Sequence, residues 1–134
     1  MNEERPVRIS SECGNKKFAI AGVAGYVAPR HIKAVKATGN VLVAAHDISD
    51  SVGILDSYFP EAYFTTDSES FRNQLKKCQV DFLSVCTPNH LHCPFSLMGL
   101  EAGADVICEK PVALSSAEVR TMSESAQACG RNIW

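Results

Sequence analysis

Short runs of apolar residues alternate with segments of helical spacing along most of the chain. A continuous apolar run bounded by turn residues is typical of a strand that is covered on both faces of a sheet. Runs of this kind predict five strands, at residues 18–21, 41–45, 62–65, 80–86 and 104–108. Residues 132–134 have the same character, and we interpret them as the beginning of a sixth strand.

The segments between these runs carry the start signals of helices. Polar residues that can cap a helix are Ser49 or Asp50, Asp67, and Ser115 or Ser116. The predicted helices cover residues 29–38, 50–58, 67–77, 91–102 and 117–128. Strand–helix units that follow one another in this way predict an α/β fold, a Rossmann-like doubly wound parallel sheet with helices on both faces.

The length of the chain bounds its organisation. A chain of 134 residues can bury one core, and neither an internal repeat nor a linker divides it. We therefore expect a polar amino-terminal tail over residues 1–17 and a single domain over residues 18–134. Because the sixth strand has only begun at the last residue, we expect the chain to be cut within an element.

Charge and hydropathy exclude several classes of partner. The chain has 13 Lys and Arg against 15 Asp and Glu, a formal net charge of −2, so it lacks the basic field that gathers nucleic acid or anionic membranes. No apolar stretch approaches the roughly 20 residues needed to cross a bilayer. The first six residues are too acidic and polar for a secretory signal. We expect a cytoplasmic protein with neither nucleic acid nor membrane as a partner.

Neither the cysteines nor the histidines have the spacing of a metal site. The sequence contains no CxxC pair, and small buried thiols are common core residues. His90 and His92 form an HxH pair, but no cysteine or acid joins them at ligand spacing. We expect no bound metal, and reduced thiols at Cys13, Cys78, Cys86, Cys93, Cys108 and Cys129.

The turn after the first strand has the glycines of a dinucleotide-binding turn. Gly22 allows a tight turn, Gly25 allows the backbone to approach a pyrophosphate, and the small Ala28 lets the following helix pack closely on the sheet. The spacing is GxxGxxA, one residue looser at the first glycine than the GxGxxG/A pattern. We expect the cofactor to contact Gly22, Ala24, Gly25, Tyr26 and Val27.

An acid follows this turn at the spacing of a ribose-binding carboxylate. Asp47 lies 25 residues after Gly22, at the end of the second predicted strand. A carboxylate there binds the hydroxyls of an adenosine ribose and repels the extra phosphate of NADP, so the sequence predicts NAD as the cofactor. The alternative is a purely structural turn with a solvated Asp47.

The fifth predicted strand ends directly in an acid, a base and a proline. In a parallel α/β sheet, ligands bind outside the carboxyl ends of the strands, which would place Glu109 and Lys110 within reach of a cofactor or substrate. An exposed surface lysine is the alternative for Lys110. His31, on the helix after the glycine turn, fits either packing or a cofactor contact.

Three segments together carry a family resemblance. They are residues 22–31, the Cys-Thr-Pro-Asn-His-Leu-His stretch at 86–92, and the Glu-Lys-Pro stretch at 109–111. This combination resembles the amino-terminal domain of the Gfo/Idh/MocA oxidoreductases over residues 18–134. Residues 25–31 and 47–54 are similar, more narrowly, to the bacterial UDP-N-acetyl-2-amino-2-deoxyglucuronate 3-dehydrogenases of surface-polysaccharide synthesis, in which the looser glycine turn is usual.

The resemblance implies roles for individual residues. Thr87, Pro88 and Asn89 would line the dinucleotide beyond its pyrophosphate, and His92 would lie next to the cofactor cleft. Glu109 and Lys110 would flank the nicotinamide ribose and the reacting sugar carbon, and Pro111, often cis in this family, would aim Lys110. As the catalytic residue, Lys110 would take or relay the proton of a sugar hydroxyl.

The resemblance also implies a function for the whole protein. We expect NAD-dependent oxidation of a sugar hydroxyl, at C3 of a UDP-linked N-acetylglucosaminuronate. Sugar specificity and a second catalytic residue would lie in a C-terminal α/β substrate domain that this chain does not reach. The resemblance further implies a homo-oligomer, since members of the family form dimers and tetramers. The alternatives are a family member that acts on a free sugar or inositol, and a protein that binds NAD without chemistry.

Overall fold

The computed structural model describes residues 15–134. Most of the polar tail, and Cys13 with it, lies outside the described residues. The first strand, β1, spans Lys17–Ala21 and so begins one residue before the predicted start of the domain.

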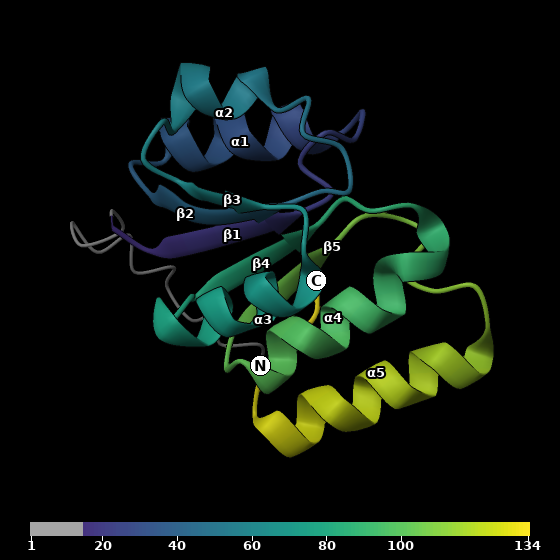
Figure 1. Ribbon diagram of the computed structural model, residues 1–134. Helices are drawn as coiled ribbons and strands as arrows, with labels where there is room; N and C mark the ends of the chain where they lie inside the picture. Colours follow the sequence, from purple (N-terminus) through teal and green to yellow (C-terminus); the bar gives the residue numbers. More distant parts are fainter. Residues whose placement is uncertain (1–14) are drawn as a thin grey trace, which may run out of the picture.

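The predicted doubly wound sheet is confirmed (Figure 1). Its five strands are all parallel to their neighbours and lie in the order β3-β2-β1-β4-β5. The chain therefore builds outward from β1 on one side and then crosses back to add β4 on the other. The other strands are β2 (Val41–His46), β3 (Tyr63–Thr65), β4 (Phe82–Val85) and β5 (Asp105–Cys108).

Helices cover both faces of the sheet. Helices α1 and α2 lie on one face and α3 and α4 on the other, with α5 packed against α4 (Figure 1). The helices are α1 (Ala28–Ala37), α2 (Gly53–Tyr58), α3 (Ser68–Lys77), α4 (His92–Glu101) and α5 (Ser116–Cys129), and a 3₁₀ turn, η1 (Asn89–Leu91), precedes α4.

Two of the predicted helix caps are confirmed and one is wrong. Asp67 caps α3 and Ser115 caps α5, each accepting a hydrogen bond from an amide three residues on. Helix α2 begins at Gly53, later than either predicted cap. The hydroxyl of Ser49 instead accepts a hydrogen bond from the amide of Ser51 at 3.3 Å. That bond makes a local turn, the competing use of a short polar side chain.

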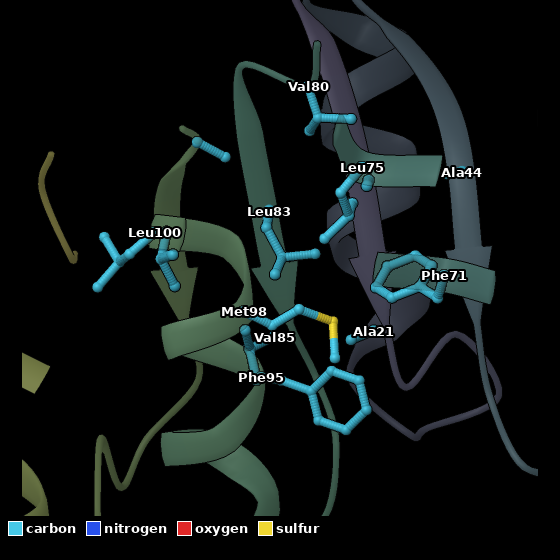
Figure 2. Close-up of a cluster of buried hydrophobic side chains, with 13 residues drawn as sticks. Ala21, Ala44, Phe71, Leu75, Val80, Leu83, Val85, Phe95, Met98 and Leu100 are labelled. Atoms are coloured by element: carbon cyan, nitrogen blue, oxygen red, sulfur yellow. The ribbon is translucent and has the colours of Figure 1, made fainter. Parts of the chain in front are cut away.

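Each face of the sheet has its own hydrophobic core. Side chains along β1 alternate, so Ala19 and Ala21 face the core under α3 and α4 while Ile20 faces the core under α1 and α2. Figure 2 shows the first of these cores, in which Phe71 from α3 and Phe95 and Met98 from α4 pack on the sheet. A core on each face requires strands that are apolar on both sides, which is the pattern of the predicted strands.

The beginning of a sixth strand is confirmed at residues 132–134. Ile133 forms a parallel bridge with Val106 of β5. The amides of Val106 and Cys108 donate to the carbonyls of Asn132 and Trp134, both at 2.9 Å. The sheet therefore extends by one short pairing beyond β5.

Three expectations concern the described part of the chain: membrane spans, cysteines and metal ligands. None of its helices combines the length and apolar character needed to span a membrane. Between residues 15 and 134 the cysteines are free thiols, namely Cys78, Cys86, Cys93, Cys108 and Cys129. In the same range, no three His, Cys, Asp or Glu side chains lie together as a metal-binding group.

Candidate cofactor-binding site

The site lies where the order of the strands reverses. β1 and β4 are neighbours, yet the chain leaves β1 toward α1 on one face and leaves β4 toward α4 on the other. A crevice opens at such a switch point, outside the carboxyl ends of the two strands. Two adjoining clefts occupy it here, of about 640 and about 360 Å³, within the size range of small-molecule sites.

The larger of the two clefts, which we call the wide cleft, runs from the glycine turn to His46 and Asp47 at the end of β2. The smaller, which we call the narrow cleft, runs from the same turn to Glu109 and Lys110 after β5. The clefts meet at Gly25, Cys86, Thr87 and Pro88, which line both. The arrangement brings together every candidate site residue named from the sequence.

The glycine turn is pressed against the end of β4. Gly22 has a φ of 83°, and a Cβ there would lie 2.5 Å from the carbonyl carbon and oxygen of Cys86. A Cβ at Gly25 would lie 2.8 Å from the same oxygen. Such distances are too short for any side chain, so both glycines are required by the fold itself. From the sequence, Gly25 was expected only to let the backbone approach a ligand, and its close contact with the carbonyl oxygen of Cys86 was not predicted.

The start of α1 keeps donors for an anion. Its N-cap, Val27, makes no side-chain hydrogen bond, and the first turn contains no acid. The amides of Ala28 and Arg30 donate to Gly25 and Val27, which leaves the amides of Tyr26 and Val27 beside the narrow cleft. Amides at a helix start are suited to phosphate oxygens, because they carry the positive end of the helix dipole.

Asp47 is bonded to the glycine turn. Its Oδ2 accepts from the amide of Ala24 at 2.9 Å and its Oδ1 from that of Ser49, also at 2.9 Å. The side chain is half-buried and lines the wide cleft. Each carboxylate oxygen has further lone pairs, so Asp47 can still accept hydrogen bonds from ligand hydroxyls.

The loop after β4 supplies an unpaired hydroxyl. Thr87 is 8% exposed and lines both clefts, and its Oγ1 is buried without a hydrogen-bond partner in the described part of the chain. A buried hydroxyl without a hydrogen-bond partner is unfavourable unless a ligand supplies the missing hydrogen bond. Pro88 and Asn89 continue the lining of the narrow cleft.

His92 ties this loop to the one after β5. It is 1% exposed at the first residue of α4, with Nε2 3.0 Å from the carbonyl oxygen of Thr87 and Nδ1 2.5 Å from that of Pro111. A neutral imidazole donates from one nitrogen at a time, and an imidazolium donates from both. The resemblance implied a position for His92 next to the cofactor cleft; the residue lines the narrow cleft, and its ring contacts backbone carbonyls.

The end of β5 presents the acid and the base. The amide of Glu109 donates to Val85 of β4 at 3.1 Å, and Lys110 is exposed at the narrow cleft. The Lys110–Pro111 peptide bond is cis, as the resemblance implied. His31 lies with Nε2 2.6 Å from Oε1 of Glu109. This hydrogen bond from His31, ahead of the nearby positive charge of Lys110, lowers the pKa of the Glu109 carboxyl.

The sequence did not predict that His46 and Cys86 would line the clefts. His46 lines the wide cleft, where Nδ1 lies 3.0 Å from the carbonyl oxygen of Thr65 and the ring stacks on Phe71 and Phe95. A histidine that ends an apolar strand was the available signal. Burial raises the pKa of the Cys86 thiol to about 12, so this cysteine at the centre of the site is a neutral packing residue.

These features fit a dinucleotide. Gly22 and Gly25 line the clefts without side chains, the amides of the turn suit phosphate oxygens, and Asp47 and Thr87 offer an acceptor and an unpaired hydroxyl. Fold and site together define a dinucleotide-binding Rossmann domain.

Comparison with known proteins gives the family. A family model described as "Oxidoreductase family, NAD-binding Rossmann fold" matches residues 16–134. The chain therefore belongs to the Gfo/Idh/MocA oxidoreductases and forms their NAD-binding domain, which confirms the resemblance seen in the sequence.

Individual solved structures and characterised proteins are also similar to this chain. The WlbA (WbpB) dehydrogenase from Thermus thermophilus, solved with NAD and UDP-GlcNAcA, is 44% identical with a TM-score of 0.85, over 89% of this chain and 40% of that one. The myo-inositol 2-dehydrogenase of Lactobacillus plantarum is 21% identical with a TM-score of 0.76, over 89% and 35% of the two chains, and shows the fold alone. The D-glucoside 3-dehydrogenase of Escherichia coli (strain K12) is 45% identical over 51 residues, 38% of this chain and 14% of that protein. The present chain spans well under half the length of each of these proteins.

Proposed function

We propose that this domain binds NAD in the two clefts and is the cofactor half of a dehydrogenase that oxidises a sugar hydroxyl. The observation that carries the proposal is the narrow cleft itself, in which an acid and a base, Glu109 and Lys110, share one wall with the glycine turn. A protein that only binds NAD needs neither side chain. The family to which the chain belongs is one of oxidoreductases.

Each part of the clefts would hold a different part of NAD. The amides of Tyr26 and Val27 would bind the pyrophosphate, and Gly22, Ala24 and Gly25, which line the wide cleft, would contact it through their backbone. Asp47 would accept hydrogen bonds from the hydroxyls of the adenosine ribose in the wide cleft. The residues that would line the nicotinamide half are Thr87, Pro88, Asn89, His92, Glu109 and Lys110.

The chemistry would take place at the mouth of the narrow cleft. NAD supplies the hydride acceptor. Lys110 would take or relay the proton of the sugar hydroxyl, and Glu109 beside it would hold the nicotinamide ribose. A second group from a substrate domain would share the transfer.

For the substrate we propose a UDP-linked N-acetylglucosaminuronate, oxidised at C3 in surface-polysaccharide synthesis. The likeness to the Thermus thermophilus dehydrogenase supports this choice, because it extends over 89% of the chain at 44% identity and that enzyme was solved with UDP-GlcNAcA. The whole protein would be a cytoplasmic homo-oligomer. The second candidate is a dehydrogenase of a free sugar or glycoside, which the 45% identity to the D-glucoside 3-dehydrogenase over 51 residues favours.

The activity is tested in a longer protein that joins this domain to a substrate domain. NADH formation is followed by fluorescence with UDP-GlcNAcA, a D-glucoside and myo-inositol in turn. The proposal expects turnover with the UDP-sugar and its loss in Lys110→Ala. Turnover with the glycoside alone would select the second candidate, and unchanged turnover in Lys110→Ala would show that the catalytic assignment is wrong.

A further inference from the structure

The contact between His31 and Glu109 joins two separate parts of the site. His31 lies in the first turns of α1, directly after the glycine turn, and Glu109 follows the last residue of β5. Their Nε2 and Oε1 atoms are 2.6 Å apart, a short distance even for a hydrogen bond with a charged partner. Residues 78 positions apart in the chain are thereby held together at the cofactor site.

Only one member of the pair, Glu109, lines a cleft. Glu109 lines the narrow cleft, whereas His31 is absent from the residues that line either cleft. The side chains are 16% and 31% exposed for His31 and Glu109, so both are shielded from much of the solvent. His31 therefore contacts the wall of the cleft through Glu109, and an effect of His31 on the ligand passes through that carboxylate.

The charged and titratable groups around Glu109 come from α1, from the next residue in the chain and from the ends of β4 and β5. His31 approaches from α1, Lys110 follows along the chain, and the thiols of Cys86 and Cys108 lie at the ends of β4 and β5. Burial raises the pKa of each of these two thiols, so both remain neutral beside the carboxylate. His31 and Lys110 are thus the groups that favour an anion at Glu109.

We propose that His31 is a positioning residue that aims the carboxylate of Glu109 into the narrow cleft and keeps it ionised as an acceptor for the nicotinamide ribose. The proposal deepens the proposed function and rests on it for the identity of the ligand. The lowered pKa of Glu109 is consistent with it, because the hydrogen bond from His31 is the largest cause of that shift. Nothing in the family match assigns this role to His31.

The pair itself is tested without any cofactor. The side-chain carboxyl carbon of Glu109 is followed by NMR as the pH is lowered, in the wild-type chain and in His31→Ala, His31→Gln and Lys33→Gln. The Nε2 of glutamine can replace that of histidine as a donor. Lys33 is an exposed cation of the same helix and serves as the matched control.

We expect the titration of Glu109 to move to higher pH in His31→Ala, to return part of the way in His31→Gln and to stay in place in Lys33→Gln. In the wild-type chain, the ring nitrogens of His31 should sense the same titration step. The same midpoint for Glu109 in wild type and His31→Ala would overturn the proposal. If His31→Ala did not fold, the wild-type ring nitrogens would decide, and their failure to sense the step would overturn it equally.

The consequence for the ligand is tested by titration with NAD. We expect His31→Ala and Glu109→Gln each to weaken binding by up to about tenfold, and the double variant to bind no more weakly than the worse single one. His31→Gln should recover most of the affinity. Additive losses, or wild-type affinity in His31→Ala, would overturn the role of His31. A wild-type chain that bound no NAD would instead overturn the proposed function, and the carboxyl titration would still decide whether the pair exists.

Discussion

The amide of Ala24 donates a hydrogen bond of 2.9 Å to the Oδ2 of Asp47. The contact links the middle of the glycine turn to the carboxylate that follows β2, across a gap of 23 residues in the chain. The two sequence signals for a dinucleotide are therefore one physical unit, in which Asp47 both fixes the turn and faces the wide cleft.

This link predicts a double effect of replacing Asp47. In Asp47→Ala the turn loses its acceptor and the cleft loses its carboxylate, so we expect NAD affinity to fall by at least about tenfold and unfolding free energy by roughly 1–3 kcal/mol. Calorimetric titration and chemical denaturation measure the two quantities. Asp47→Asn, which keeps an acceptor oxygen, should lose less stability. Full stability in Asp47→Ala would contradict a structural role for the carboxylate.

Gly22→Ala should disrupt the turn more severely than a change at another glycine of the same conformation. Gly22 and Gly103 have φ values of 83° and 85°, but a Cβ at Gly22 would meet the backbone of Cys86 at 2.5 Å whereas one at Gly103 would meet nothing within 4 Å. We expect Gly103→Ala to lose about 1 kcal/mol from its backbone conformation alone. Gly22→Ala should lose about 1–3 kcal/mol more from overpacking, together with NAD binding. Equal losses on denaturation would argue against the close packing of the turn on β4.

The unpaired hydroxyl of Thr87 offers a test that separates binding from stability. Because Oγ1 has no partner within the described residues, Thr87→Val should leave unfolding free energy unchanged or slightly raised while weakening NAD binding several-fold. Ser96→Ala is the control, since its hydroxyl is also buried but lies outside both clefts. Thermal melts and NAD titrations of the two variants are compared. A wild-type affinity in Thr87→Val would show that the hydroxyl does not face the cofactor.

The pKa of Glu109 predicts an acid-dependent part of the stability. A carboxyl group whose pKa is lowered by folding contributes stability above its unfolded value, near 4.5, and this contribution disappears as pH falls through the lower folded value. Glu109→Gln should therefore be less stable than wild type near neutral pH and approach it below that window. Melting temperatures across the acid range measure the difference. Asp67, whose pKa is lowered by its hydrogen bonds from Ser70, is unchanged in the variant and leaves part of the acid dependence in place.

Much of the fold could be predicted because its signals are local. Apolar runs mark the strands of a sheet buried on both faces, and the caps at Asp67 and Ser115 depend on side chains within a few residues. The start of α2 was predicted wrongly for a related reason. Ser49 is a residue type that caps helices, but its hydroxyl accepts from the amide of Ser51 in a local turn, and composition does not decide between these two uses of a polar side chain.

The site could be predicted only as far as the strand ends could be placed. Residues at the carboxyl ends of neighbouring parallel strands share a rim, which places Asp47, Thr87 and Lys110 near one another. The pairing of His31 with Glu109 could not be predicted, because it depends on how α1 is rotated against the sheet. The same holds for the packing of Gly22 on Cys86, a contact between two backbones that leaves no mark in residue type at position 86.

The central claim is that this chain holds NAD at the switch point of its sheet, and a calorimetric titration of the folded chain with NAD and with NADP tests it most directly. We predict that NAD binds and that NADP binds more weakly, because its extra phosphate would meet the carboxylate of Asp47. We also predict that this preference diminishes in Asp47→Ala. A chain with a folded circular dichroism spectrum that bound neither nucleotide would contradict the account.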